Sequence, residues 1–206
     1  MIHLLLSMAL FSAPTDPHLN EVSTNICPCD ISSEEIQGTI ETMYQVAFGE
    51  GPLVGLAAPQ IGIQKRIILV DTAATAVCTH TPPTELKAFI NPEILWQSDE
   101  QLLWCEGCFS TDRIFGIVPR AQKILISAHD REGNILTEEY EGYVARIFQH
   151  AIDHLDGIRF PDRVVDENSL HWVEDHEIAQ YRIDWTHWPN KYSREKWLEL
   201  KNGHPF

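Results

Sequence analysis

The segment QHAIDH, residues 149–154, lies within a longer run, residues 141–157, on which the interpretation of the whole chain depends. The apolar positions of this run are Val144, Ile147, Phe148, Ala151, Ile152 and Leu155. Their spacing predicts an amphipathic helix, and Gly157 is a suitable C-terminal stop. Residues four apart lie above one another on a helix, so His150 and His154 project from the same face.

Two imidazoles at this spacing can bind one transition-metal ion. The spacing is that of the H-E-x-x-H motif of metalloproteases, in which the glutamate acts as general base. Here Ala151 occupies the glutamate position, so the ligand pair is kept and the proton-transferring carboxylate is lost. Two unrelated surface histidines would give the same pattern, and this segment alone leaves both interpretations open.

Two upstream segments carry further reactive side chains. WCEGCFS, residues 104–110, supplies the thiol of Cys108, and VGLAAPQIG, residues 54–62, is a Gly/Ala-rich bend with one amide side chain, Gln60. In this order and at these separations, the three segments closely resemble the peptide deformylase family, whose hallmarks are G-x-G-x-A-A-x-Q, E-G-C-x-S and H-E-x-D-H. The chain departs from these motifs at Leu53, which replaces the leading glycine, and at Ala151. The resemblance extends from about residue 16 to residue 163.

Composition sets limits on the class of protein. With 206 residues, 44% hydrophobic and 22% charged, the chain is expected to form an ordinary globular domain. Its net charge of −15 argues against direct nucleic-acid binding and against anionic membrane surfaces. Its five cysteines, an odd number, favour a reducing compartment, so we expect a cytoplasmic protein and treat the Cys27-Pro28-Cys29 segment as a loop.

The apolar N-terminus, residues 1–11, has two interpretations. Its composition is that of a signal-peptide core, but no basic leader precedes it and no convincing cleavage site follows. We therefore expect a buried strand or an ordered arm.

Short β-rich runs flank the predicted ligand helix. The predicted strands cover residues 65–71, 89–94, 116–120, 123–128 and 135–137, and residues 102–104 lead into the Cys108 motif. An earlier helix is expected after a capping box formed by Ser32 and Glu35. The predicted fold class is α+β, with small mixed or antiparallel sheets packed around the central metal-ligand helix.

The pattern predicts a deformylase-like domain over residues 1–165 and a Trp-rich C-terminal extension over residues 166–206. This extension contains Trp172, Trp185, Trp188 and Trp197. We expect it to pack on the same domain, because so many tryptophans are costly to leave in water. A partner-binding role is the alternative.

The predicted metal ligands are Cys108, His150 and His154. Three protein ligands leave one coordination position open, as in catalytic metal sites. The resemblance implies one divalent ion, ferrous iron, with zinc or nickel able to occupy the same site. Cys105 offers an alternative, because a C-x-x-C pair joined to the two histidines would make a closed structural zinc site.

The resemblance also implies roles around the metal. The Gln60 amide and the backbone N–H of Phe109 would stabilise an oxyanion, although Gln60 could also simply close a turn. Glu106 would orient the site through hydrogen bonds. Asp153 would hold a ligand imidazole or cap a loop, or would be a salt-bridged surface residue.

Substrate contacts follow from the same comparison. An extended peptide would pair with the backbone at Val54 and Gly55. Trp104, Tyr143 and Ile147 would line a methionine-sized pocket, or would be plain core residues.

The predicted function is that of a metal-dependent hydrolase of the peptide deformylase type, which removes the formyl group from N-formylmethionyl peptides. Activity is expected to be impaired because residue 151 is alanine. The alternative is a non-catalytic deformylase-like protein that binds metal and peptide without turnover. The expected partners are nascent N-formylated peptides and, transiently, the ribosome.

Overall fold

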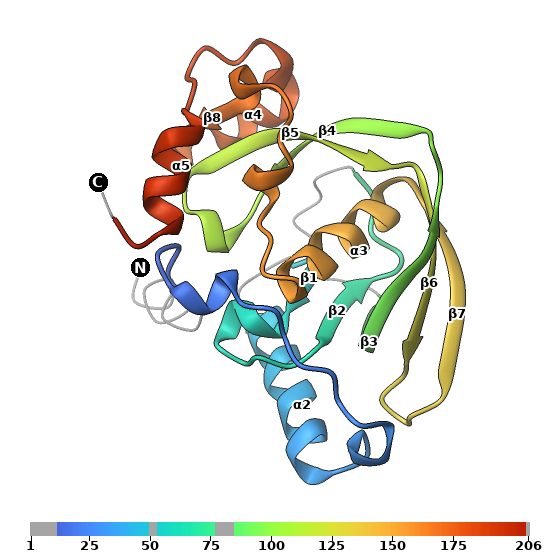
Figure 1. Cartoon of the computed structure of the whole chain (residues 1–206). Coiled ribbons are helices and arrows are strands. Elements are labelled where there is room, and N and C mark those ends of the chain that lie inside the picture. The colour runs from blue at the N-terminus through green and yellow to red at the C-terminus, as the bar shows by residue number, and fades with distance from the viewer. Residues whose placement is uncertain (1–11, 50–52, 77–84, 205–206) are drawn as a thin grey trace.

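Two antiparallel sheets organise the computed structural model, which describes residues 12–49, 53–76 and 85–204 (Figure 1). The larger sheet has the strand order β1-β2-β3-β6-β7. Its strands are β1 (Gly55–Ala57), β2 (Ile67–Asp71), β3 (Leu86–Gln97), β6 (Lys123–His129) and β7 (Ile135–Glu141). The expectation for residues 1–11 lies outside the described residues.

The smaller sheet has the order β4-β5-β8 and brings the end of the chain beside its middle. Its strands are β4 (Gln101–Gly107), β5 (Ile114–Ala121) and β8 (Leu170–Trp172), all paired antiparallel. In this register Glu106 lies opposite Gly116, and Phe115 lies opposite His171. β4 and β1 are each the first strand of their sheet, so each offers one backbone edge.

Helix α3 (Gly142–Leu155) confirms the helix predicted from the histidine-containing run. It packs against both sheets, with contacts to β1 and β2 on one side and to β5 on the other (Figure 1). The chain leaves the helix at Gly157, where φ is +70°. A β-carbon there would lie 2.4 Å from the backbone oxygen of Asn20, so this exit requires glycine.

Helix α2 (Glu34–Gly49) covers the opposite face of the larger sheet. The alternation along β2 explains both layers, because Ile67 and Leu69 join the α2 core whereas Ile68 and Val70 join the α3 core. The helix is capped by Ser33, whose hydroxyl accepts the N–H of Ile36. The predicted capping residue, Ser32, was therefore wrong by one position.

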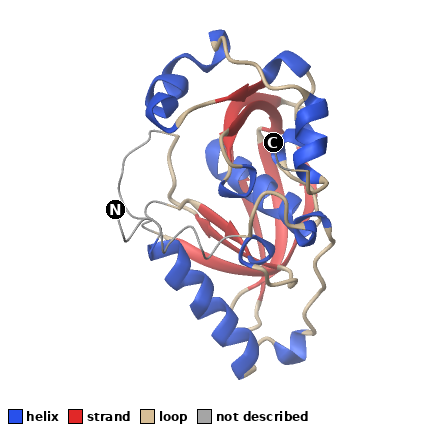
Figure 2. Cartoon of the chain, turned by 90° about the vertical axis from the view of Figure 1, so that its left-hand side faces the viewer, coloured by secondary structure: helices blue, strands red, loops and turns tan. Residues whose placement is uncertain are grey.

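Short helices fill the connections, and Figure 2 shows the strands grouped centrally with helical segments around them. They are η2 (Pro17–Asn20), η3 (Pro28–Asp30), η4 (Ala58–Ile61), η5 (Phe109–Thr111), η6 (Phe160–Arg163), η7 (Glu167–Ser169), η8 (Asp175–Glu177), α4 (Ile178–Asp184), η9 (Trp185–His187) and α5 (Arg194–Lys201).

The segment after residue 165 contributes to the interior. Trp197 is fully buried in a cluster with Phe160 and Leu170, while Trp185 and Trp188 are only half-buried. β8 pairs with β5 across the boundary that we predicted at residue 165. The division of the chain at this position stays a prediction.

The predicted α+β class with antiparallel sheets is confirmed. The interpretation of Cys27 and Cys29 needs correction, because the structure joins them in a disulfide at the surface. The turn at η3 brings their α-carbons to 5.2 Å, which is within the range that a disulfide requires. None of the helices in the described ranges has the length and apolar character needed to cross a bilayer.

Candidate metal and catalytic site

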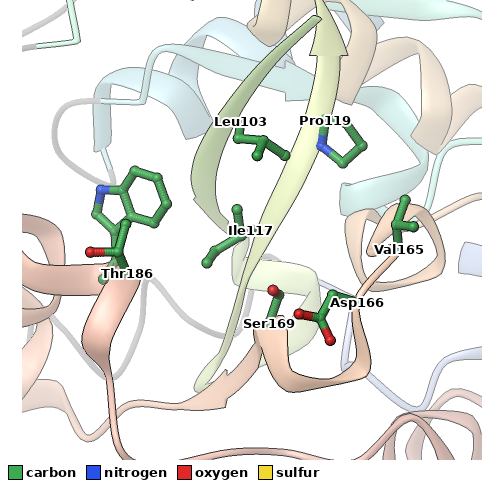
Figure 3. A pocket seen from close by; sticks show the side chains of 8 residues that line it. Leu103, Ile117, Pro119, Val165, Asp166, Ser169 and Thr186 are labelled. Carbon is green, nitrogen blue, oxygen red and sulfur yellow. The ribbon is translucent and has the colours of Figure 1, made fainter.

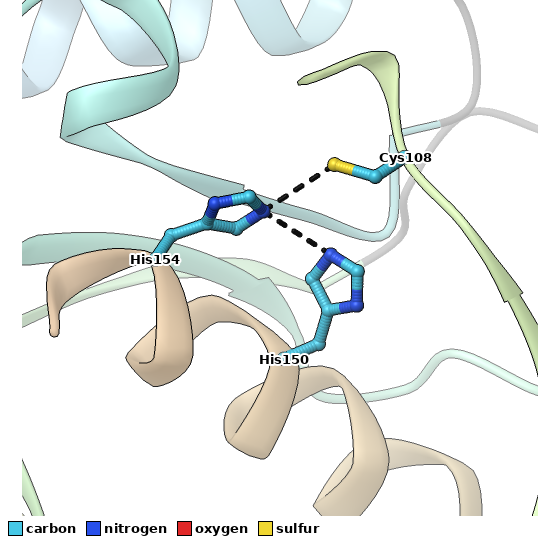
Figure 4. Close-up of side chains that lie close together, drawn as sticks. All are labelled: Cys108, His150 and His154. Carbon is cyan, nitrogen blue, oxygen red and sulfur yellow. Dashed lines mark hydrogen bonds between the residues drawn. The ribbon is translucent and has the colours of Figure 1, made fainter. Parts of the chain in front are cut away.

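Three donor atoms meet between α3 and the end of β4 (Figure 4). The Nε2 atom of His154 lies 3.3 Å from the Sγ atom of Cys108 and 3.3 Å from the Nε2 atom of His150. The two histidines come from successive turns of α3, and Cys108 immediately follows β4. One sulfur and two imidazole nitrogens form a donor set suited to iron, nickel or zinc.

Cys105 is not part of this cluster. The described residues that group with Cys108 are only His150 and His154, with all three donor atoms within 4.8 Å of one another. Cys105 precedes Glu106 on β4, and neighbouring side chains on a strand point to opposite faces. The closed Cys₂His₂ site therefore lacks its fourth ligand.

Glu106 connects the site to buried arginines. Its Oε2 atom lies 2.8 Å from Nδ1 of His150, and Arg120 donates to both of its carboxylate oxygens at 2.9 Å. Arg146 donates to Oε1 at 2.5 Å. Burial by itself would raise the pKa of Glu106, but the charges of Arg120 and His150 outweigh it and hold that pKa far below its usual value. Glu106 is therefore a permanent carboxylate behind the His150 ring.

Asp153 is buried, and its carboxylate pairs with Arg120 and Arg163. The expected contact with a ligand imidazole is wrong, because Nδ1 of His150 lies against Glu106 and, within the described residues, the buried Nδ1 of His154 has no hydrogen-bond partner. The expected salt bridge is present, but its expected place at the surface is wrong, because Asp153 is 5% exposed. Asp153 instead acts on the site through Arg120 and Glu106.

Gln60 faces the cluster from η4. Its Oε1 atom accepts the N–H of Ala57 at 2.9 Å, which closes the turn, as the simpler interpretation predicted. Its Nε2 atom donates to Ser110 Oγ at 3.2 Å and to Cys108 Sγ at 3.3 Å. The same side chain thus closes the turn and aims an amide donor at the candidate site.

Phe109 is the first residue of η5, and its side chain is half exposed. It follows Cys108 directly, so its backbone N–H belongs to the same turn as the sulfur. Thr111 Oγ1 and the Thr111 N–H both donate to the Cys108 carbonyl, at 2.9 and 3.0 Å. These bonds define the shape of the turn.

Position 151 offers no group that can transfer a proton. Ala151 is buried in the core cluster on the α3 side of the larger sheet. Within the described part of the chain, no carboxylate belongs to the donor cluster of Cys108, His150 and His154.

The remaining predicted substrate residues lie on both sides of the site. Val54 and Gly55 lie at the beginning of β1, and a β-carbon on Gly55 would lie 2.7 Å from the Ile147 side chain. Ile147 is buried and Tyr143 is partly buried in the same core cluster. Trp104 is 39% exposed, and its ring lies 6.0 Å from that of Trp185.

In the absence of a metal ion, the cluster favours a thiolate and a protonated ring. Burial opposes ionisation of Cys108, but His154 and His150 lower the pKa of the thiol well below its usual value. Burial also disfavours the charged His150 ring, yet its bonds to Cys108 and Glu106 raise its pKa to about 10. Metal binding would displace that proton, because a coordinated imidazole is neutral.

Sequence reasoning missed several residues around the site. They are Ser110, Arg120, Arg146, Arg159 and Arg163. For Arg120, Arg146 and Arg159 the available signal was a single arginine within an apolar run, since long basic side chains are almost never buried without partners.

A separate hollow of about 450 Å³ lies beside β4 and β5 (Figure 3). Leu103, Ile117, Val165 and Trp185 contribute to its apolar lining. Its lining includes none of the metal-donor residues, so it is distinct from the candidate site.

The fold and the site together define a class: an α+β protein with a Cys/His/His cluster on a central helix. A family model described as polypeptide deformylase matches residues 9–169, and the chain belongs to this family. The family is metal-dependent, and the cluster of Cys108, His150 and His154 is the possible metal site of this chain.

Individual relatives agree with this assignment. A peptide deformylase from Thermomicrobium roseum is 36% identical over 162 residues, which cover 79% of this chain and 89% of the relative. The chloroplastic/mitochondrial peptide deformylase 1A of Arabidopsis thaliana is 35% identical over 163 residues, which cover 74% of this chain and 60% of that relative's length. The structure of an Acinetobacter baumannii peptide deformylase with bound Met-Ala-Ser has a TM-score of 0.69 at 29% identity, covering 75% of this chain and 96% of that one.

Proposed function

We propose that this chain binds one divalent metal ion through Cys108, His150 and His154 and acts on N-formylmethionyl peptides, with hydrolysis impaired by Ala151. The observation that carries the proposal is the convergence of these three donors beside the Gln60 amide. Membership of the deformylase family supports the reaction class.

The residues present fit a divalent ion. A thiolate, two imidazole nitrogens and no fourth protein donor among the described residues match the open donor set of catalytic metals. The resemblance favours ferrous iron, and nickel or zinc would suit the same donors. A bound ion would supply Lewis acidity, by which it activates water and polarises the formyl carbonyl.

Side-chain and backbone groups of the chain would stabilise the oxyanion and orient a metal ligand. The Gln60 Nε2 donor and the backbone N–H of Phe109 are the donors that we assign to the developing oxyanion. Glu106 holds the His150 ring through Nδ1, so that Nε2 faces the other donors.

With alanine at position 151, the protein has no side chain at this position that can transfer a proton. Positioned acid–base catalysis typically contributes about 10²–10⁴-fold, so turnover should be slower than in a glutamate-containing form by a factor of this order. Metal and oxyanion groups would leave a residual rate.

Peptide binding is proposed along the two strand edges. β1 begins beside Val54 and β4 ends just before Cys108, so an extended peptide could pair with backbone next to the candidate metal. We assign Trp104, Tyr143 and Ile147 to the methionine side chain as a proposal.

The decisive experiment measures formate release from formyl-Met-Ala-Ser by protein loaded with Fe(II) under anaerobic conditions, with Ni(II) as a stable substitute. Slow release by the natural sequence and a gain of roughly 10²–10⁴-fold in Ala151→Glu are expected. Ala151→Gln is the matched control, because it has a similar volume but no carboxylate. No formate from the natural sequence or from Ala151→Glu would exclude deformylase activity.

Binding without turnover is the second candidate function, and the alanine at position 151 is the observation that favours it. Calorimetry with metal-loaded protein, combined with the formate assay, distinguishes binding without turnover from catalysis. Tighter binding of formyl-Met-Ala-Ser than of Met-Ala-Ser, without formate release, would identify a binding protein. Equal affinity would exclude that function.

We propose that the substrates are nascent N-formylated peptides and that the protein contacts the ribosome transiently. The net charge of −15 disfavours direct nucleic-acid binding. We propose a cytoplasmic location, which the bacterial relatives support.

A further inference from the structure

Arg159 is a fully buried cation close to the candidate site. Its Nη1 atom donates to the carbonyls of Pro14 at 2.5 Å and Ser110 at 3.3 Å. Its Nη2 atom donates to Asn20 Oδ1 at 2.9 Å, and none of the described residues accepts a hydrogen bond from its Nε atom. Within the described residues its guanidinium forms no ion pair with a carboxylate. A buried cation held mainly by neutral oxygens is unusual, because burying a charge is costly unless it is well paired.

Helix α5 covers one face of this guanidinium. Its Cζ atom lies 4.6 Å from the centre of the Trp197 ring, an arrangement in which the ring attracts the cation. Trp197 is itself anchored, because its Nε1 atom donates to Asp162 Oδ1 at 2.8 Å. Lys201 pairs with the other oxygen of Asp162 at 2.6 Å, and that oxygen also accepts the Arg159 backbone N–H. Helix α5 and Asp162 therefore fix the position of Arg159.

On its other side, Arg159 reaches the turn that contains the candidate catalytic groups. The carbonyl of Ser110 accepts from Arg159, and the hydroxyl of Ser110 accepts from Gln60. Gln60 in turn donates to Cys108. Contacts thus run without a gap from Trp197 through Arg159 and Ser110 to Gln60.

We propose that Arg159 is a positioning residue of the active site and that α5 supports it, so that the C-terminal segment sets the geometry of the turn formed by residues 108–111. The catalytic part of this inference rests on the proposed function. By fixing the Ser110 carbonyl, Arg159 fixes the backbone N–H of Phe109 and the orientation of Gln60. Trp197 keeps the guanidinium in the plane from which it reaches Ser110.

A positioning role for Arg159 predicts that its substitution lowers kcat and leaves KM almost unchanged. Small displacements of positioned groups reduce the chemical step strongly, whereas peptide contacts at Val54 and Gly55 do not involve Arg159. Arg159→Leu and Trp197→Leu should therefore lower kcat about tenfold or more, with KM for formyl-Met-Ala-Ser changed by less than about twofold. Arg159→Lys keeps the charge and should recover part of the loss.

The test uses the full chain and two measurements. Hydrogen exchange of peptides covering residues 108–111 reports the turn directly and needs no turnover. Exchange there should rise at least about tenfold in Arg159→Leu and Trp197→Leu. Leu200→Ala is the matched control, because Leu200 lies in the same helix and core cluster as Trp197 but has no aromatic ring to stack on the guanidinium. Steady-state kinetics in the Ala151→Glu background supply kcat and KM.

Each result either supports the positioning role of Arg159 or overturns it. Equal changes in Trp197→Leu and Leu200→Ala, or unchanged exchange at residues 108–111 in Arg159→Leu, would overturn the proposal. Trp197→Phe keeps an aromatic face and provides a milder variant if Trp197→Leu does not fold. Absence of formate from every variant would refute the proposed function, whereas the exchange results would still test the role of Arg159.

Discussion

The carboxylate of Glu106 lies 2.8 Å from Nδ1 of His150, and this contact determines which nitrogen of the ring faces the other donors. The opposite nitrogen, Nε2, lies 3.3 Å from Nε2 of His154. Arg120 and Arg146 hold the carboxylate in turn, so the orientation of one candidate ligand depends on a buried charge network.

Glu106→Gln should weaken metal binding about 10–100-fold, because it removes the charge that orients His150 and makes its ring a stronger donor. Competition with a chelator of known affinity measures this change. Glu100→Gln is the control, since Glu100 is exposed on the surface. Equal affinity of Glu106→Gln and the natural sequence would contradict an orienting role for Glu106.

Cys108→Ala should abolish stoichiometric binding of the metal ion, because two imidazoles alone remain. Cys105→Ala should keep one ion per chain, since Cys105 lies outside the donor cluster. Metal analysis after gel filtration distinguishes these outcomes. Loss of metal from both variants would instead support the closed site with four protein ligands.

Gln60→Ala should lower kcat for formate release by about 10²–10³-fold in the Ala151→Glu background, since one oxyanion donor is removed. Part of the loss would come from the released Ala57 N–H and Ser110 hydroxyl. Gln97→Ala, at an exposed position of β3, serves as the control. Unchanged kcat in Gln60→Ala would leave Gln60 with turn closure as its only role.

Gly157→Ala should destabilise the fold by more than the roughly 1–2 kcal/mol expected for a left-handed backbone alone. Its β-carbon would also meet the backbone oxygen of Asn20 at 2.4 Å. Gly133→Ala isolates the backbone contribution, because Gly133 has φ of +87° with open space around it. Urea unfolding gives both free energies, and equal losses would show that the Asn20 contact relaxes at no cost.

Stability should fall as the pH drops below about 6.5, in part through His171. Burial lowers the pKa of this ring, the Asn168 carbonyl opposes that shift, and Lys191 adds to it. The Tyr181 hydroxyl lies 3.0 Å from Nδ1 and carries no charge in this range. Because the unfolded chain takes up a proton at a higher pH than the folded chain, stability from the neutral ring is complete above 6.5. It is lost as the pH falls toward the folded pKa.

Urea titrations above and below this pH test the contribution. His171→Gln should flatten the dependence of the unfolding free energy on pH. An unaltered slope in His171→Gln would assign the acid sensitivity to other groups.

The parts of the molecule that could be predicted are those that follow from the periodicity of apolar residues and from the spacing of motif residues. The 3.6-residue pattern of α3 placed His150 and His154 on one face, and the E-G-C-x-S segment pointed to Cys108. The buried arginines were not predictable, because their partners come from distant strands: Arg120 pairs with Glu106 across the β4–β5 pairing and also with Asp153 on α3. The burial of Asp153 was not predicted for the same reason. The Cys27–Cys29 disulfide escaped prediction because it depends on one turn's geometry rather than on the count of cysteines.

The late position of β8 and Trp197 has a consequence for biosynthesis. The three-stranded sheet and the surroundings of Arg159 are completed only by residues that are synthesised after α3 and the larger sheet. A partly synthesised chain can form α3 and the larger sheet, but it lacks the stacking partner of Arg159 and the outer strand beside β5. The surroundings of Arg159 therefore take their final form only after residues 170–197 have been translated.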